Sequence, residues 1–313
     1  MILSIIIPAH NESNNINATM EEILAITGKM HDIDKTEVIV VDDHSSDNTY
    51  DVVDNMNDSR VLCLRLSRQS GSHTALRAGF IESNGDFVMC LSADGQDDPN
   101  CLNQMLSKLY SGCNIVWALR KNRNNESMIL RLFAKTFYKI LLKLTGSEQS
   151  GIDLSRADFY ILDRPVLDAI KSCSERNTSL FGLISWLGFK QEFVEYERRE
   201  RMSGLSKWNF RSRLRLAKDW IIAFSGLPLK FMTVMGFFVA FMGFLYALYL
   251  ISNFFLRHPT SGWSSLMVVV LVLGGLQMVM FGIVGEYLWR NLDESRKRPL
   301  YFIEKSTDEV NNK

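Results

Sequence analysis

The stretch FVMCLSADGQDDP, residues 87–99, decides the fold. Phe87 to Leu91 is a short apolar run, which is typical of a buried strand, and an acidic cluster follows it from Ser92 to Pro99. A strand that stops at such a cluster places oxygen atoms at the rim of a sheet, where open α/β sheets bind their ligands. Hard divalent cations prefer oxygen ligands, and diphosphates need such a cation. The stretch therefore indicates an α/β fold with a ligand site at the strand ends.

Earlier segments of the chain repeat this pattern. Three apolar, β-branched runs predict strands: Leu3–Ile7, Val38–Val41 and Val61–Leu66. The stretches between them are helix-like: Asn14–Thr27, Asn48–Asn55 and Thr74–Ser83. Alternating strands and helices predict a mostly parallel sheet with covered faces. The polar residues that end the strands should then gather at one edge and form a cleft: 10–12, 42–44 and 92–94.

Composition and missing motifs exclude several function classes. Lys plus Arg and Asp plus Glu both total 35, so the net charge gives no reason to expect a nucleic-acid partner. The five cysteines form no CxxC pair, which argues against zinc or a disulfide framework. No GxGxxG follows the first strand and no GxxxxGK[ST] occurs, which argues against a standard dinucleotide fold and a P-loop NTPase.

The C-terminal part predicts a pair of membrane spans. The uncharged runs Phe231–Leu256 and Pro259–Gly285 each exceed the roughly 20 residues that cross a bilayer. Only Arg257 and His258 separate them, so residues 257–262 should be a tight turn between antiparallel helices. Basic residues flank the pair on both outer sides, and the positive-inside rule then places both termini in the cytoplasm.

Two further segments are basic and amphipathic. Residues 211–223 lead directly into the first span, which favours a helix on the membrane surface. For residues 128–144, a membrane-surface helix and an ordinary core-facing helix both remain open. The predicted organisation is a cytoplasmic α/β domain over 1–210, a juxtamembrane amphipathic helix over 211–228, a two-helix transmembrane hairpin over 229–288 and a cytoplasmic tail over 289–313.

Six motifs carry a family resemblance. PAHNE (8–12), VVDDHSSDNT (40–49) and SADGQDDP (92–99) resemble the signatures of family 2 glycosyltransferases with the GT-A fold. ADFYILDRPVLDAI (157–170), RMSGLSKW (201–208) and GEYLWRNLDESRKRPLYFI (285–303) resemble the narrower polyprenyl-phosphate group, which includes bactoprenol glucosyltransferases and dolichol-phosphate mannose synthases. The resemblance implies a Rossmann-like, mostly parallel GT-A domain followed by two transmembrane helices of the bacterial type.

The resemblance also implies a reaction and its partners. A metal-dependent, inverting hexosyltransferase of this kind moves a sugar from a nucleotide-sugar donor, here UDP-glucose, to undecaprenyl phosphate. The product is a polyprenyl-phosphate-linked monosaccharide for modification of lipopolysaccharide or another cell-envelope glycan. The expected setting is multi-pass in the inner (cytoplasmic) membrane, as a homo-oligomer, with a tetramer implied by the resemblance.

The resemblance assigns the donor side of the site. Asp94 and Gln96 are the expected ligands of Mg²⁺ or Mn²⁺. Ser92 stands where the family often has an aspartate, so either Ser92 assists through water or the metal affinity is weaker. Asp97 and Asp98 are alternative ligands, but residues that precede a proline at a helix start are more often caps. The expected nucleotide-binding residues are Pro8, His10, Asn11, Glu12, Asp42, Asp43 and Ser72.

On the acceptor side, Asp158 stands where the resemblance places the catalytic base. A phosphate monoester has a second pKa near 6 and is already nucleophilic at neutral pH, so Asp158 either orients the acceptor or takes a residual proton. A purely structural pairing with an arginine remains an alternative. Arg198 and Arg199 are expected to be solvated or to contact lipid head groups. The residues expected to bind phosphate or the acceptor are Arg120, Arg123, Arg131, Arg201 and Lys207.

Two other functions compete with this interpretation. A processive polysaccharide synthase of the cellulose or hyaluronan type has a similar core. It needs a Gln-x-x-Arg-Trp motif, which this chain lacks, and a channel that two spans cannot enclose. The other alternative is an inactive, membrane-anchored scaffold, suggested by Ser92.

Overall fold

The computed structural model describes residues 1–121, 156–173, 178–199, 226–255 and 262–307, together with residues 152, 175, 176 and 222. The chain forms two compact units. One comprises Met1–Ala217 with Pro299–Lys313, and the other comprises Lys218–Arg298.

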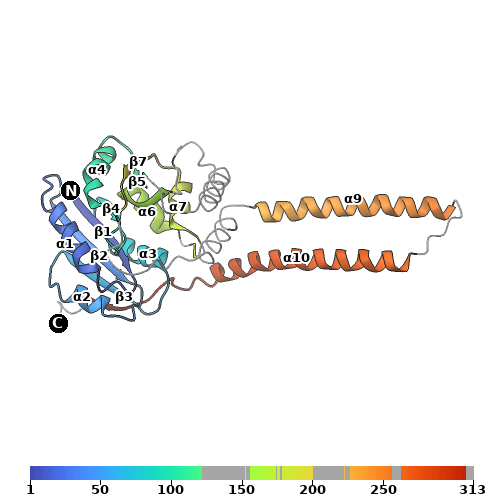
Figure 1. Cartoon of the computed structure of the whole chain (residues 1–313), viewed down its shortest axis with the longest axis horizontal. Coiled ribbons are helices and arrows are strands. Elements are labelled where there is room, and N and C mark those ends of the chain that lie inside the picture. Colours follow the sequence, from blue (N-terminus) through green and yellow to red (C-terminus); the bar gives the residue numbers. More distant parts are fainter. Residues whose placement is uncertain are drawn as a thin grey trace. The chain divides into compact units, whose positions relative to one another are not determined.

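An eight-stranded sheet organises the first unit (Figure 1). Its order is β7-β5-β6-β4-β1-β2-β3-β8. Among the described residues, β6 and β8 run against the other strands, so the predicted mostly parallel sheet is confirmed. The strands are β1 (Ile2–Ala9), β2 (Lys35–Asp42), β3 (Val61–Leu66), β4 (Phe87–Cys90), β5 (Ile115–Arg120), β6 (Ala157–Asp163), β7 (Gln191–Tyr196) and β8 (Ile303–Ser306).

Helices cover both faces of this sheet. They are α1 (Ile16–Thr27), α2 (Thr49–Asp54), α3 (Ser72–Glu82), the 3₁₀ turn η1 (Pro99–Cys101), α4 (Leu102–Tyr110), α6 (Arg164–Ser172) and α7 (Leu180–Trp186). Leu3, Ile5 and Ile7 of β1 share one buried cluster with apolar residues of α1 and α4. Successive strand residues point to opposite faces, so Ile6 points the other way. There it meets α3, where a Cβ added at Gly79 would lie 2.4 Å from Ile6 Cγ2.

Strand β1 continues beyond Ile7, where the sequence predicts that it ends before Pro8. Pro8 pairs with Val41, and the strand ends at Ala9. Strand β4 pairs with β1 only as far as Ile6. Pro8 lies beyond the residues that pair with β4, so no residue of β4 needs a hydrogen bond from the N–H that proline lacks.

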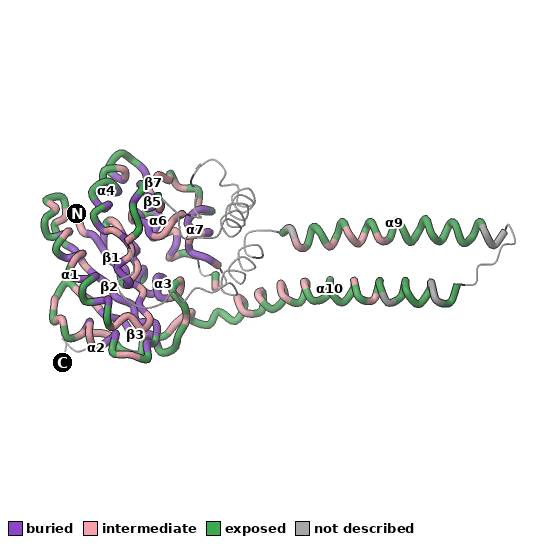
Figure 2. Tube along the Cα trace, in the orientation of Figure 1, coloured by how far each residue is buried: buried purple, intermediate pink, exposed green. Residues whose placement is uncertain are grey.

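The second unit contains two long apolar helices, α9 (Leu227–Phe255) and α10 (Trp263–Ser295). Within them, Pro228–Ser252 and Leu266–Ser295 are long and apolar enough to be candidate membrane spans by length and composition. Figure 2 shows exposed or intermediate burial along their described residues. Large side chains such as those of Phe237 and Phe281 are exposed. The predicted amphipathic segments 128–144 and 211–223, apart from residue 222, and the predicted turn 257–262, apart from Gly262, lie outside the described residues.

The C-terminal residues require a correction to the predicted organisation. The sequence interpretation treats 289–313 as a tail that follows the hairpin. Helix α10 instead continues to Ser295, and β8 pairs antiparallel with β3. The last strand of the sheet therefore comes from residues that follow the apolar helices in the sequence.

Candidate active site

The strand ends bring the first two motifs together. Ala9 at the end of β1 pairs with Asp42 at the end of β2. Immediately after these strands, Asn11 and His44 adopt positive φ angles of 54° and 55°. This left-handed conformation is uncommon outside glycine, and such backbone is concentrated at functional sites. The predicted gathering of polar strand ends is present at this edge of the sheet.

Asp42 and Asp43 are both buried and both make internal hydrogen bonds. Asp42 Oδ1 accepts from the Ser45 N–H at 3.0 Å, and Asp42 Oδ2 accepts from Arg65 Nη1 at 2.7 Å. The Asp43 carboxylate accepts from the backbone N–H groups of Ser70 at 2.6 Å and Gly71 at 2.8 Å. These contacts use both carboxylates to shape the loops around the edge.

Asp43 therefore lies where an anion is expected, just ahead of the first turn of α3. The backbone N–H groups at a helix N-terminus favour negative charge. Ser72 is the first residue of α3, and Gly71 before it has φ +91°, a conformation that glycine adopts without strain. The loop that leads into α3 is tied in this way to the end of β2.

The first motif is fixed to the same loop. Asn11 donates its backbone N–H to Ser45 Oγ at 2.9 Å, and Asn11 Oδ1 accepts from the Ser46 N–H at 2.8 Å. The Glu12 N–H donates to Thr49 Oγ1 at 3.0 Å. His10 Nδ1 lies 3.0 Å from the Asp43 carbonyl oxygen. These contacts bring five of the predicted nucleotide-binding residues to the region between β2 and α2: His10, Asn11, Glu12, Asp42 and Asp43. Pro8 lies in the adjacent strand β1.

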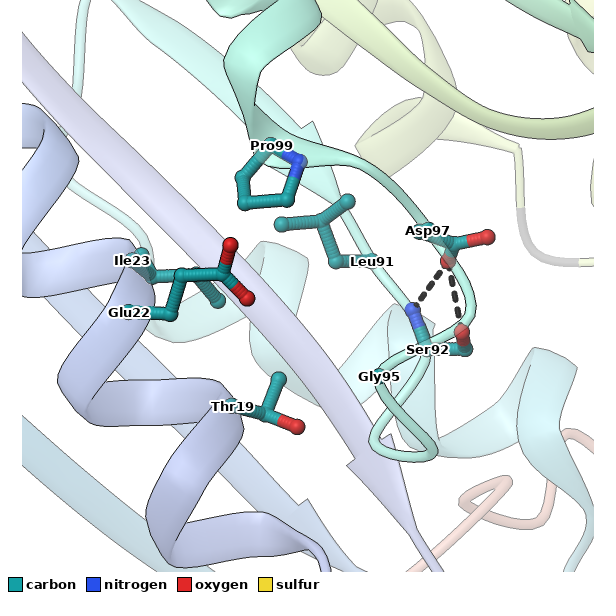
Figure 3. Close-up of a pocket in the computed structure, with 8 residues that line it drawn as sticks. All are labelled: Thr19, Glu22, Ile23, Leu91, Ser92, Gly95, Asp97 and Pro99. Carbon is teal, nitrogen blue, oxygen red and sulfur yellow. Dashed lines mark hydrogen bonds between the residues drawn. The ribbon is translucent and has the colours of Figure 1, made fainter. Parts of the chain in front are cut away.

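The acidic cluster after β4 is organised around Ser92. The Ser92 N–H donates to Asp97 Oδ2 at 2.7 Å, and Ser92 Oγ lies 2.6 Å from the same oxygen and 2.8 Å from Asp94 Oδ1. Figure 3 shows the Ser92–Asp97 pair beside a small depression that α1 residues and Pro99 also line. The serine that replaces the expected acid therefore holds two neighbouring acids in place.

The pKa of Asp97 is raised to about 6, and burial is the largest cause of this shift. The charges of Asp158 and Asp94 also raise this pKa, while the hydrogen bonds from Ser92 oppose the shift. Asp98 behaves as the sequence predicts, because its side chain accepts from the Asn100 N–H and caps η1. Asp97 does not cap that turn and faces the interior network instead.

The predicted metal ligands fit a divalent cation in their chemistry. Asp94 supplies a carboxylate at the strand rim, and carboxylate and amide oxygens suit Mg²⁺ and Mn²⁺. Gln96 Oε1 accepts from Arg198 Nη2 at 2.8 Å, so that guanidinium occupies one of the two acceptor positions of this oxygen. Within the described ranges, no group of three or more His, Cys, Asp or Glu side chains is arranged to hold a metal ion.

Asp158 lies on β6, and its partners among the described residues include Tyr196, Arg120 and Arg198. Tyr196 donates its hydroxyl to Asp158 Oδ2. Arg120 Nε lies 2.9 Å from Asp158 Oδ2, but its N–H does not point at the carboxylate, so the contact is an ion pair without a hydrogen bond. Arg198 Nη1 lies 3.8 Å from Asp158 Oδ1. Burial raises the pKa of Tyr196 far above its usual value, and the charges of Asp97 and Asp158 raise it further, so the phenol stays protonated.

Tyr196 also links Asp158 to the acidic cluster, since its hydroxyl oxygen lies 3.4 Å from Asp97 Oδ1. The Tyr196 phenol therefore bridges Asp158 of β6 and Asp97 in the loop after β4. Arg120, predicted to bind phosphate, lies beside Asp158 and brings a cation to this group of acids. The other predicted phosphate contacts, Arg123, Arg131, Arg201 and Lys207, lie outside the described residues.

Arg199 corrects one expectation. Its guanidinium donates to Glu22 from Nη1 and to Asp98 from Nη2 at 2.7 Å. It thus joins α1 to η1 and is not simply solvated. Arg198 likewise contacts Gln96 and Asp158. The fixed positions of these arginines follow from pairing between distant segments, which no local pattern predicts.

Two residues of the network are absent from the sequence interpretation, because Tyr196 and Arg65 lie on strands whose sequences give no functional signal. Asp97 is named there as an alternative ligand or a helix cap. The alternation of β7 offers a partial signal for Tyr196, because Val194 and Tyr196 are buried on one face while Glu195 is exposed.

Comparison with known proteins identifies the family. Residues 4–157 match the model of glycosyl transferase family 2, and residues 227–290 match that of the GtrB C-terminal hairpin. A bactoprenol glucosyl transferase of Shigella phage SfII is 33% identical over 312 residues, covering 98% of each chain. The chain belongs to glycosyl transferase family 2. An uncharacterized glycosyltransferase of Synechocystis is 36% identical to this glycosyltransferase over 304 residues, covering 96% of this chain and 94% of that protein.

The fold of this glycosyltransferase has a solved counterpart. The crystal structure of mannosyl-3-phosphoglycerate synthase from Rubrobacter xylanophilus matches with a TM-score of 0.50 and 18% identity, over 71% of this chain and 72% of that one. At this identity the similarity shows the fold alone. The α/β unit of the glycosyltransferase is a GT-A domain, as the motifs predict, and the two candidate membrane spans follow it.

Proposed function

We propose that this glycosyltransferase moves glucose from UDP-glucose to undecaprenyl phosphate and inverts the anomeric carbon. The observation that carries the proposal is the joining of a family 2 domain to a hairpin of the GtrB type, in a chain that matches bactoprenol glucosyl transferases over nearly its whole length. A water-soluble acceptor would not require two long apolar helices. A polyprenyl phosphate, with its hydrocarbon tail, does.

The donor would bind at the edge formed by the ends of β1, β2 and β4. Asn11 and the loop after β2 are already ordered there by hydrogen bonds, which lowers the entropic cost of binding a nucleotide. Asp94 and Gln96 would hold Mg²⁺ or Mn²⁺. Such a cation, when bound, offsets the charge that develops on the leaving diphosphate.

The acceptor would be received near Asp158. One oxygen of the lipid phosphate forms a bond to the anomeric carbon, while the bond from that carbon to the diphosphate oxygen breaks and UDP leaves with the electron pair. A single displacement of this kind inverts the carbon. The phosphate is largely dianionic at neutral pH, so it needs little help from a base. Asp158, held by Tyr196 and Arg120, would orient the acceptor, and Arg120 and Arg198 supply the positive charge that phosphate binding requires.

The membrane arrangement is part of the proposal. Basic residues on the outer sides of both apolar runs support a topology in which the chain crosses the inner membrane twice and keeps its termini and the GT-A domain in the cytoplasm. The proposed setting also includes assembly into a homotetramer, as the family resemblance implies.

The test is a product assay on membranes that contain the full chain. Membranes are incubated with a panel of UDP- and GDP-sugars and undecaprenyl phosphate, with and without Mn²⁺, and the lipid fraction is analysed by mass spectrometry. The expected product is a hexosyl undecaprenyl phosphate from UDP-glucose, and NMR of that product should show the β anomer. Insoluble polymer would favour a processive synthase. Donor binding without turnover would favour an inactive scaffold.

Two variants test the assigned residues. Asp94→Ala should lose metal-dependent turnover by about 10²-fold or more, since it removes the anionic ligand. Asp158→Asn should lower kcat more than it weakens donor binding, because Asp158 would contact the acceptor directly and reaches the acidic cluster through Tyr196. Full metal-dependent turnover by Asp94→Ala would show that the ligand assignment is wrong.

A further inference from the structure

The strand that follows the apolar helices contributes a side chain to the donor edge. Strand β8 pairs with β3 through Leu64 with Ser306, Arg65 with Lys305 and Leu66 with Ile303. The register thus shifts between Arg65 and Leu66, and Glu304 is the extra residue of a bulge. Bulges re-aim side chains. Here Glu304 Oε2 lies 3.2 Å from Arg65 Nε and 3.6 Å from His44 Nδ1.

Arg65 connects Glu304 to the loop after β2. Its Nη1 donates to Asp42 Oδ2 at 2.7 Å, and its Nη2 donates to the Ser45 carbonyl oxygen at 3.0 Å. A guanidinium is planar, and its donors point in fixed directions. When Glu304 fixes Nε and Asp42 fixes Nη1, the direction of Nη2 toward Ser45 is set.

The loop after β2 in turn holds the PAHNE motif (8–12). The Ser45 N–H donates to Asp42 Oδ1, Ser45 Oγ accepts from the Asn11 N–H, and the Ser46 N–H donates to Asn11 Oδ1. Both Asn11 and His44 have positive φ angles, so this loop needs outside contacts to keep its shape. A continuous series of contacts runs from Glu304 through Arg65 and Asp42 to Asn11.

We propose that Glu304 is a positioning residue for the nucleotide site and acts through Arg65 on residues 44–46 of the loop after β2. The inference rests on the proposed function, which places the nucleotide at this edge. Lys305 provides a matched contrast on the same strand. Its Nζ lies 5.8 Å from the centre of the Tyr50 ring, and it pairs with Arg65 through the backbone. Glu304 and Lys305 therefore share the strand but differ in their contact with the loop.

The experiment compares Glu304→Gln with Lys305→Gln in the full chain, purified in detergent. Hydrogen exchange followed by mass spectrometry reports on the Ser45 and Ser46 amides, with the Ser70 and Gly71 amides as an internal reference because Asp43 holds them independently of Arg65. Titration with UDP and Mn²⁺ reports on nucleotide affinity. Donor KM and kcat are measured alongside.

For Glu304→Gln we expect exchange in residues 44–46 to be faster by about threefold or more, and the Kd for UDP and the donor KM to rise by about three- to tenfold, with kcat within about twofold of the parent. Exchange at Ser70 and Gly71 should not change, and Lys305→Gln should resemble the parent throughout. The proposal is overturned if loop exchange is unchanged in Glu304→Gln, if the reference amides accelerate equally, or if Lys305→Gln gives the same shifts. Should the parent protein bind no UDP, the proposed function fails, and the exchange data alone still decide the role of Glu304.

Discussion

Replacement of Gly79 by alanine tests how closely α3 is held against the sheet. The added Cβ would lie 2.4 Å from Ile6 Cγ2 and 3.3 Å from Ile6 Cδ1 and Cγ1. Ile6 is 0% exposed, and β2 and β4 flank β1 on either side, so it has little room to retreat. Overpacking of this kind costs about 1–3 kcal/mol. Alanine recovers up to about 1 kcal/mol relative to glycine through helix propensity. The net result should be a destabilisation of about 1–2 kcal/mol.

The effect should also reach the donor edge, because the loop entering α3 donates two backbone N–H groups to Asp43. Urea unfolding of the full chain in detergent, followed by circular dichroism, should show a lower midpoint for Gly79→Ala with an unchanged slope.

A double-mutant cycle separates the clash from other effects of the substitution. Ile6→Ala removes the three atoms that the new Cβ would meet, at a cost of its own of about 2–5 kcal/mol from the cavity. In the Ile6→Ala background, Gly79→Ala should therefore be neutral or stabilising, giving a coupling energy of about 1 kcal/mol or more. A Gly79→Ala protein as stable as the parent, or a cycle without coupling, would refute the close packing of α3 on β1.

Other predictions concern the acidic network. Asp97 has a folded pKa of about 6 against 3.8 in the unfolded chain, so the folded state binds more protons between these values and its free energy of unfolding should fall as pH rises through about 4 to 6. In metal-free buffer, Asp97→Asn should remove up to about 3 kcal/mol of that fall, and an unchanged pH slope would contradict the burial of Asp97. Arg120→Lys should raise the KM for the lipid phosphate more than it lowers kcat, because a compact ammonium cannot replace the planar guanidinium beside Asp158. An effect confined to the donor KM would count against this. Gly71→Ala should lower stability by about 1 kcal/mol or more, since φ +91° is strained for alanine, and an unfolding midpoint equal to that of the parent would disprove this.

The core strands and the edge proposed to bind the donor could be predicted from sequence because their signals are local. Strand β3 coincides with its predicted run, and the polar residues after the parallel strands β1, β2 and β4 lie at one edge of the sheet. A parallel sheet buried on both faces produces continuous apolar runs, and each run here ends at a polar motif. The pattern therefore predicts the order of the core strands along the chain and the ends that form the site.

Long-range pairing could not be predicted in this way. Arg65 bonds to Asp42 across neighbouring strands, and Tyr196 reaches Asp158 from β7, although nothing in the sequence near either residue indicates its partner. The bonds of Ser92 to Asp94 and Asp97 depend on a tight turn whose geometry residue types alone do not fix. Strand β8 is short and charged, and it follows an apolar helix, so its sequence resembles that of a tail.

The position of β8 has a consequence for biosynthesis. While the chain emerges from the ribosome, β3 is made long before its outer neighbour, and its free edge must wait until both apolar helices have been translated. An unpaired edge can template association with another chain. Nascent copies should therefore be vulnerable to mispairing during that interval, and a fragment ending before residue 299 would keep the vulnerability permanently.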